Sequence, residues 1–189
     1  MGMSALPTTG WTVDMLEALP DDGKHYEIID GELFVTPAPR RAHQRAVLRL
    51  AILLDAYLRS RHDVEVLHSP ADIRRGERTS VQPDVFVVPI EEGQQAQRWP
   101  EVHALLLAVE VLSPGTARVD RHQKRRLYQR EGVAEYWIVD LDSRLVERWR
   151  PGDERPEILT ETLDWRPGGV EQPLVINLEE LFEEAGNGE

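Results

Sequence analysis

The sequence predicts an α/β fold in which a mixed central sheet is flanked by helices and preceded by an N-terminal hairpin. Three short apolar runs, each the length of one buried strand, lie at 85–90, 105–112 and 134–141. Two longer segments, 38–62 and 118–132, have the pattern of helices. Continuous apolar strands that alternate with helices are typical of a partly parallel sheet covered on both faces.

The composition is that of a globular protein. Of the 189 residues, 41% are hydrophobic and 30% are charged, which is enough for one domain with a substantial core. No apolar run is long enough to cross a bilayer, and the first ten residues lack the pattern of a secretion signal. We therefore expect a cytoplasmic protein with no membrane partner. The absence of cysteine excludes disulfides, thiolate metal sites and cysteine nucleophiles.

The first half of the chain is expected to contain a short helix, a hairpin, a long helix and several strands. The short helix, within 11–24, ends near Pro20, and Asp30 and Gly31 supply the two-residue turn of the hairpin. Two strands are expected within 64–77, before the apolar strand that begins at Pro83. The long helix has residues at helical spacing on one face: His43, Val47, Leu50, Leu54 and Tyr57.

The second half alternates between strands and helices. A polar loop, 91–101, leads to the strand at 105–112, and Gly132 ends the helix that follows. After the strand at 134–141, two more strands and a terminal helix are expected, at 144–150, 157–163 and 178–185. Because no repeat, linker or low-complexity tract divides the chain, we predict a single domain, 1–189.

Charge is distributed unevenly along the chain. The net charge of −12 argues against a nucleic-acid partner. However, 140–189 holds 14 acidic residues against 5 basic ones, so the acidity is mostly C-terminal. The segment 118–130 has 6 basic residues against 1 acidic residue. This basic helix is compatible either with a nucleic-acid contact or with an ordinary solvated face.

Two carboxylates occupy positions that are costly for a charge. Glu110 interrupts an apolar strand, and Asp84 stands at the entrance of another. If the two strands are neighbours, the carboxylates converge and repel each other unless they share a cation. Since only hard oxygen donors are present, that cation would be Mg²⁺ or Mn²⁺, and such a site suits phosphoryl chemistry.

A lysine lies on the helix that follows Glu110. The chain has 20 arginines but only two lysines, Lys24 and Lys124, which suggests that Lys124 is needed as a compact ammonium. Asp120, Lys124 and Tyr128 are spaced at i, i+4 and i+8, so they share one face of the helix. A nearby ammonium could orient or deprotonate an attacking water, or stabilise the charge of the transition state.

These motifs resemble a known family. The stretches "QPDVFVV", "AVEVLSPGT" and "DRHQKRRLYQREGVAEYWIVD" resemble the PD-(D/E)xK nuclease superfamily. More narrowly, they are similar to its restriction-endonuclease family that is expanded in cyanobacteria. The hairpin "YEIIDGEL" and the segment "GVAEYWIVD" match the same layout. The resemblance covers a nuclease-like core at 12–150 and leaves 151–189 as an acidic strand and helix extension.

The resemblance implies a restriction-endonuclease-like fold and a metal-dependent phosphodiesterase. Asp84 and Glu110 would bind the metal, and the backbone carbonyl of Val111 would complete its shell. The superfamily pattern expects a lysine two positions after the second carboxylate, but Leu112 stands there. In this family the lysine is expected on the next helix, which makes Lys124 the matching residue.

Further residues are candidates for secondary roles. The resemblance implies a catalytic role for Glu27, in the hairpin, while His43 lies on the inward face of the long helix. Gln82 precedes the Pro-Asp pair and could hold a water or a phosphate. On the basic helix, Arg121 and Arg125 are expected to approach the substrate backbone.

Each main candidate also has a purely structural interpretation. Asp84 could cap a strand, and Glu110 could form a buried ion pair with an arginine. Lys124 could be a solvated residue of a basic helix. Glu27 could lie on a solvated strand face, and His43 could be a histidine at the edge of the core.

Three functions therefore remain open. The first is a Mg²⁺-dependent endonuclease, with DNA as the expected substrate. The second is an inactive domain that keeps the nuclease fold for dimerisation or nucleic-acid binding. The third is a hydrolase of small phosphodiesters, which would need a closed pocket. Because restriction-type nucleases often dimerise, a homodimer is expected, with the aromatic strands 135–139 and 146–150 as candidate interfaces.

Overall fold

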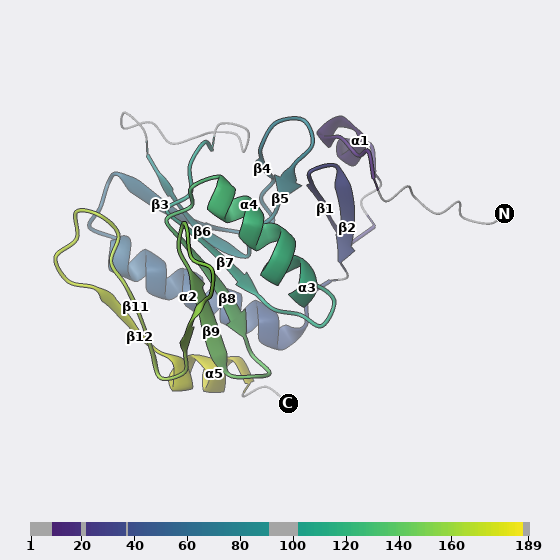
Figure 1. The fold of residues 1–189 in the computed structure, drawn as a ribbon. Coiled ribbons are helices and arrows are strands. Elements are labelled where there is room, and N and C mark those ends of the chain that lie inside the picture. Colours follow the sequence, from purple (N-terminus) through teal and green to yellow (C-terminus); the bar gives the residue numbers. More distant parts are fainter. Residues whose placement is uncertain (1–8, 20–21, 37, 91–101, 187–189) are drawn as a thin grey trace.

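The computed structural model describes residues 9–19, 22–36, 38–90 and 102–186. Figure 1 shows how the elements succeed one another along the chain. The helices are α1 (Val13–Glu17), α2 (Arg41–Leu58), α3 (Ala117–Val119), α4 (Arg125–Arg130) and α5 (Leu178–Gly186). A turn of π-helix, η2 (Asp120–Lys124), joins α3 to α4 without a break.

Twelve strands lie within the described part of the chain. In chain order they are β1 (His25–Ile29), β2 (Glu32–Thr36), β3 (Val64–His68), β4 (Ile73–Arg74), β5 (Ser80–Val81), β6 (Val85–Pro89), β7 (Leu107–Val111), β8 (Glu135–Asp140), β9 (Leu145–Trp149), β10 (Glu157–Leu159), β11 (Thr162–Trp165) and β12 (Leu174–Asn177).

The central sheet is mixed, as the sequence predicts. Its six strands are ordered β10-β9-β8-β7-β6-β3. Only β7 and β8 run parallel, and the helical segment from α3 to α4 connects them; the other neighbours are antiparallel. A parallel pair requires such a crossover, whereas antiparallel neighbours can be joined by short turns.

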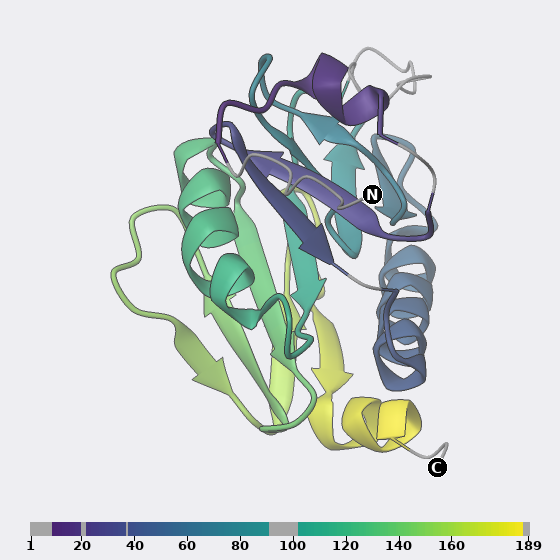
Figure 2. The same cartoon turned by 90° about the vertical axis from the view of Figure 1, so that its right-hand side faces the viewer.

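The two faces of this sheet are covered by different elements. Side chains alternate along a strand, so Val109 faces one side and Ala108 the other. The Val109 side packs against α2, α5 and the two-stranded sheet of β11 and β12. The Ala108 side packs against α4 and the smaller sheet β2-β1-β5-β4. Figure 2 shows the helix from α3 to α4 and helix α2 on opposite sides of the strands.

The N-terminal hairpin forms as expected. Strands β1 and β2 pair antiparallel around Asp30 and Gly31, whose φ angles are 51° and 84°. Positive φ at both central residues is the geometry of a type I′ turn, which suits Asp-Gly and matches the twist of the strands. Through β5, the hairpin joins the smaller sheet and comes to lie on the α4 side of the central sheet.

The structure differs from the expected elements at several points. Helix α2 is shorter than the expected 38–62. Pro39 lacks the backbone N–H that a helix interior needs, so the helix begins after it, and Arg59 begins a turn at the other end. The strand expected at 157–163 is two strands, β10 and β11, which belong to different sheets. Strands β5 and β12 were not expected, since each is only two to four residues long. The polar loop 91–101 lies outside the described residues.

The aromatic strands considered as dimer interfaces pack inside this chain. Tyr136 and Trp137 on β8 and Trp149 on β9 are all buried in the cores on the two faces of the sheet. A ring that is already buried cannot supply a surface to a partner, so the expectation that these aromatics form an interface is wrong. No helix in the described ranges is long and apolar enough to span a membrane.

Helix α2 offers a test of the core. Leu54 is fully buried against the sheet, whereas Ile52, on the same helix, is 49% exposed. We expect Leu54→Ala to lower the free energy of unfolding by about 2–5 kcal/mol, because it leaves a cavity. Ile52→Ala should change it by less than about 1 kcal/mol. Urea denaturation measures both, and equal losses would contradict this packing.

Candidate active site

The two predicted carboxylates meet at the end of the β6–β7 pair. Val85 pairs with Val109, so continuing the antiparallel register sets Asp84 opposite Glu110. The β6–β7 pairing stops at Val85 and Val109, so the backbone N–H of Val111 has no hydrogen-bond acceptor on β6. The Asp84 carboxylate replaces that partner, since the Val111 N–H donates to Asp84 Oδ2 at 2.8 Å. The sequence position of Asp84, one residue before the strand, thus brings its side chain to β7.

Glu110 points to the α4 side of the sheet, where it meets a lysine. Alternation along β7 gives Glu110 the same direction as Ala108, away from α2. There Lys124 Nζ donates to Glu110 Oε1 at 2.9 Å, and both residues are buried. The buried ion pair considered for Glu110 therefore exists, but its cation is Lys124 and not an arginine. Lys124 is not a solvated residue of a basic helix.

The N-terminal hairpin adds a third group to this pair. Glu27 Oε1 lies 2.9 Å from Lys124 Nζ and also accepts the Gln82 backbone N–H at 2.7 Å. Glu27 is buried, so it is not on a solvated strand face. The Gln82 side chain contacts His25 and Asp72. Gln82 thus links the hairpin to the strand that leads to Asp84.

Two residues of the helix complete the cluster. The Tyr128 hydroxyl donates to Glu110 Oε1 at 3.1 Å, and Asp120 Oδ1 lies 3.6 Å from Lys124 Nζ. The π turn spans Asp120 to Lys124 and widens the helix where these groups face the sheet. Single π turns inside α-helices are frequent at functional sites. Asp120 and Tyr128 are not among the site residues predicted from the sequence, although their i, i+4, i+8 spacing with Lys124 already indicates that all three share one helix face.

The buried charges do not balance. Glu27, Glu110 and Asp120 surround one ammonium, so the cluster has more carboxyl groups than cationic groups. Burial raises the pKa of Glu110 well above its usual range, and Lys124 offsets only part of this effect. For Lys124, burial disfavours the charged form, but Glu110, Glu27 and Asp120 outweigh it and raise its pKa well above the usual value. Lys124 is therefore held as an ammonium.

His43 lies on the other side of the carboxylate pair. Its Nε2 is 3.1 Å from Asp84 Oδ2, so helix α2 positions a proton donor against this aspartate. Burial alone would lower the pKa of His43. The hydrogen bond to Asp84, the Asp84 charge and the Val111 backbone outweigh burial and raise it. His43 Nδ1 is buried and has no hydrogen-bond partner within the described chain.

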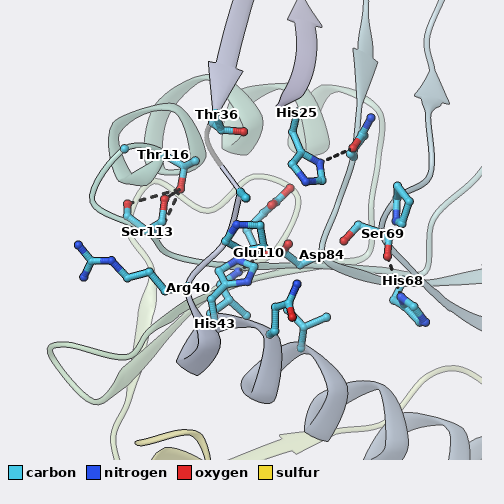
Figure 3. Close-up of a pocket in the computed structure, with 18 of the residues that line it drawn as sticks. His25, Thr36, Arg40, His43, His68, Ser69, Asp84, Glu110, Ser113 and Thr116 are labelled. Carbon is cyan, nitrogen blue, oxygen red and sulfur yellow. Dashed lines mark hydrogen bonds and ion pairs between the residues drawn. The ribbon is translucent and has the colours of Figure 1, made fainter. Parts of the chain in front are cut away.

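A pocket of about 830 Å³ joins these groups. Figure 3 shows Asp84, Glu110 and His43 directed toward one another inside it. Its walls come from the start of α2, the hairpin and the Ser113–Thr116 turn. The predicted residues among its lining are Glu27, His43, Gln82, Asp84, Glu110, Val111 and Lys124.

Two predicted substrate-binding arginines lie elsewhere. Arg121 is held by Glu147 at 2.6 Å and Asp140 at 2.9 Å. The Arg125 guanidinium stacks over the Trp149 ring at 4.7 Å. Neither residue is among those that line the pocket. Their positive charges are engaged by the sheet's own side chains, so the structure does not bring them to the carboxylate pair.

The donor set suits a hard cation with several water ligands. Among the described residues, the hydrogen bonds and ion pairs of Asp84 go to Oδ2 and those of Glu110 go to Oε1, which leaves Asp84 Oδ1 and Glu110 Oε2 as the candidate oxygens for a metal. In the part of the chain that is described, no three His, Asp or Glu side chains form a ready ligand group. Two carboxylates with a backbone carbonyl fit Mg²⁺, which commonly keeps waters and binds one or two carboxylates.

The fold and the carboxylate–lysine cluster define a protein of the restriction-endonuclease-like class that the sequence resemblance predicts. The chain belongs to the Uma2 family, which matches residues 13–185 and is described as "Putative restriction endonuclease". The family resemblance is thereby confirmed.

A solved structure supports the fold independently. The chain is similar to a "putative nuclease belonging to DUF820" from Anabaena variabilis, seen in a crystal structure. The TM-score is 0.74 and the sequence identity 20%, over 93% of this chain and 99% of the other. At this identity the likeness shows the fold, and the mixed α/β prediction is confirmed. No curated protein matches the sequence.

Asp120 gives a prediction about stability and pH. Burial, only partly offset by Lys124, raises its pKa from 3.8 to about 6. The folded state therefore favours protonated Asp120. This stabilisation is fully present below the pKa of the unfolded chain and is lost as pH rises through about 6. Asp120→Asn should therefore raise the free energy of unfolding at pH 8 by about 1–3 kcal/mol, and by less at pH 5.

Asp140 is a control of opposite sign. Burial opposes its ionisation, but hydrogen bonds from Ser143 and Arg121 lower its pKa. Its stabilisation is present above the unfolded pKa, so Asp140→Asn should destabilise the protein at pH 8. Urea denaturation across pH 5–8 tests both variants. A destabilised Asp120→Asn variant at pH 8 would show that the Asp120 charge is needed to hold the cluster.

Proposed function

We propose that the chain is a Mg²⁺- or Mn²⁺-dependent endonuclease that hydrolyses phosphodiester bonds of DNA. One observation carries the proposal: Lys124 Nζ lies 2.9 Å from Glu110 Oε1 in the pocket that also contains Asp84. A lysine on the following helix thus contacts Glu110, one of the two proposed metal carboxylates, although Leu112 occupies the usual position. The description of the Uma2 family supports the choice of a nuclease, and of DNA.

The proposed metal ligands are Asp84, Glu110 and the Val111 carbonyl. When bound, a divalent cation would neutralise phosphate charge and lower the pKa of a water ligand. The Val111 N–H and His43 fix the Asp84 carboxylate, while Lys124 and Tyr128 fix that of Glu110. Each carboxylate thus has one oxygen held by described residues, and its other oxygen is the proposed metal ligand, which is the arrangement that a preorganised site needs.

The protonation state of Lys124 limits what it can do in catalysis. Because neighbouring carboxylates hold it as an ammonium, Lys124 is a poor base toward water at neutral pH. We therefore assign it to orienting the attacking water and stabilising negative charge that develops on the phosphate. Glu27 has a supporting role, since it bonds Lys124 and the backbone of Gln82. Two copies would place one site on each DNA strand, so the proposal includes a homodimer.

An inactive module is the second candidate, and one observation favours it. The carboxylates converge on Lys124, so an ammonium already satisfies part of their charge without a metal. Buried ion pairs of this kind also occur in purely structural cores. Calorimetry with Mn²⁺ separates the two candidates, because the module would bind no metal and the nuclease would bind it through Asp84 and Glu110.

Removal of either metal carboxylate should abolish cleavage. We expect Asp84→Asn and Glu110→Gln each to lower the rate on plasmid and linear DNA at least about 100-fold. Glu65→Gln is the matched control, since Glu65 lies in a second "VEVL" tetrapeptide, on the edge strand β3. A nicking assay with Mg²⁺ or Mn²⁺ measures the rates, and circular dichroism checks the fold. A wild-type chain that cuts neither DNA nor RNA would contradict the proposal.

Lys124 should not tolerate arginine. A guanidinium is larger than an ammonium, and the Lys124 position is closed by Glu27, Glu110 and Asp120. We expect Lys124→Arg to lose about as much activity as Lys124→Met, although only the former keeps the charge. Lys24→Arg, at the other lysine, which is exposed, should keep full activity. Full activity in Lys124→Arg would show that any cation at this position suffices.

A further inference from the structure

The arginines at the start of α2 stand beside the proposed catalytic pocket. Arg40, Arg41 and Arg45 all line it, together with the carboxylate pair. The acidic residues of the lining are Glu27, Asp84 and Glu110, all of which belong to the proposed site. The pocket therefore has an acidic base and a basic wall. Figure 3 shows the Arg40 side chain at the edge of the pocket, on the side of Ser113 and Thr116.

The arginines of α2 differ in their partners according to their position. Farther along the helix, Arg49 forms an ion pair with Glu184 at 2.6 Å, and just beyond its end Arg59 forms one with Asp55 at 3.4 Å. Arg40 and Arg45 have no acidic partner among the residues that the structure describes. Since acidic side chains neutralise Arg49 and Arg59 but not Arg40 or Arg45 within the described chain, the two positive charges beside the pocket are available to a ligand.

One atom of Arg45 strengthens this distinction. Its Nη1 is buried and has no hydrogen-bond partner in the described part of the chain. A buried guanidinium nitrogen without an acceptor costs free energy, so such groups are normally paired. An anion that enters the pocket would supply the missing acceptor. Arginine suits a phosphate in particular, because its planar fork can bind two phosphate oxygens at once.

We propose that Arg40 and Arg45 form a phosphate-binding wall that holds the nucleic-acid backbone beside the carboxylate pair. The inference rests on the proposed nuclease function and names the groups that bind its substrate. It replaces Arg121 and Arg125 in this role, since those residues are engaged by Glu147, Asp140 and Trp149.

The test compares two double variants of the full chain with the same loss of charge. Arg40→Gln/Arg45→Gln removes the wall. Arg59→Gln/Arg126→Gln removes two exposed arginines outside the pocket. Fluorescence anisotropy with a labelled DNA duplex in EDTA measures binding without cleavage, over a series of salt concentrations. The wall variant should bind at least about tenfold more weakly, with a log–log salt slope reduced by about 0.9 per lost phosphate contact.

The control double variant should bind like wild type with an unchanged slope. Equal weakening of both double variants, unchanged binding by the wall variant, or a wild type that binds no DNA would each overturn the inference.

The proposed phosphate-binding wall and the proposed nuclease activity can fail independently of each other. If wild type binds DNA through Arg40 and Arg45 but cuts nothing with Mg²⁺ or Mn²⁺, the wall stands and the nuclease proposal fails. If wild type cuts DNA and the wall variant binds and cuts equally well, the nuclease proposal stands and the wall fails.

Discussion

The contact on which the site depends is the buried ammonium of Lys124 between Glu27 and Glu110. It joins three parts of the fold: the hairpin through β1, the central sheet through β7, and the helix between β7 and β8. Removing one partner from such a cluster leaves an uncompensated buried charge, which is far more costly than the loss of a surface ion pair. The position of Lys124 is therefore fixed by electrostatics as well as by packing.

Much of the fold could be predicted from sequence because its elements carry strong local signals. The Asp-Gly turn, the apolar face of α2 and the three apolar strands each correspond to a described element. The short strands β5 and β12 carry too few residues for a pattern. The segment 157–163 reads as one strand because sequence alone does not show that the chain changes sheets after Leu159.

Part of the candidate site could also be predicted from the sequence. Asp84 and Glu110 are charged residues beside apolar runs, and Lys124 is one of only two lysines in the chain. The contact of Glu27 with Lys124 could not be read from the residues, because it depends on how the hairpin docks on the α4 side of the sheet. Arg121 and Arg125 show the converse: a basic run marks charge, but only the fold decides that acidic and aromatic side chains of the sheet engage it.

The placement of Glu27 on the hairpin has a consequence for folding. Glu27 is distant in the sequence from both Glu110 and Lys124, so the cluster is complete only after this long-range contact has formed, and such contacts slow folding. A partly folded chain with an intact central sheet but an undocked hairpin would leave Lys124 with Glu110 and Asp120 alone. Full assembly of the cluster therefore requires the hairpin to dock, and a chain stalled before that step would have a formed core and an unfinished site.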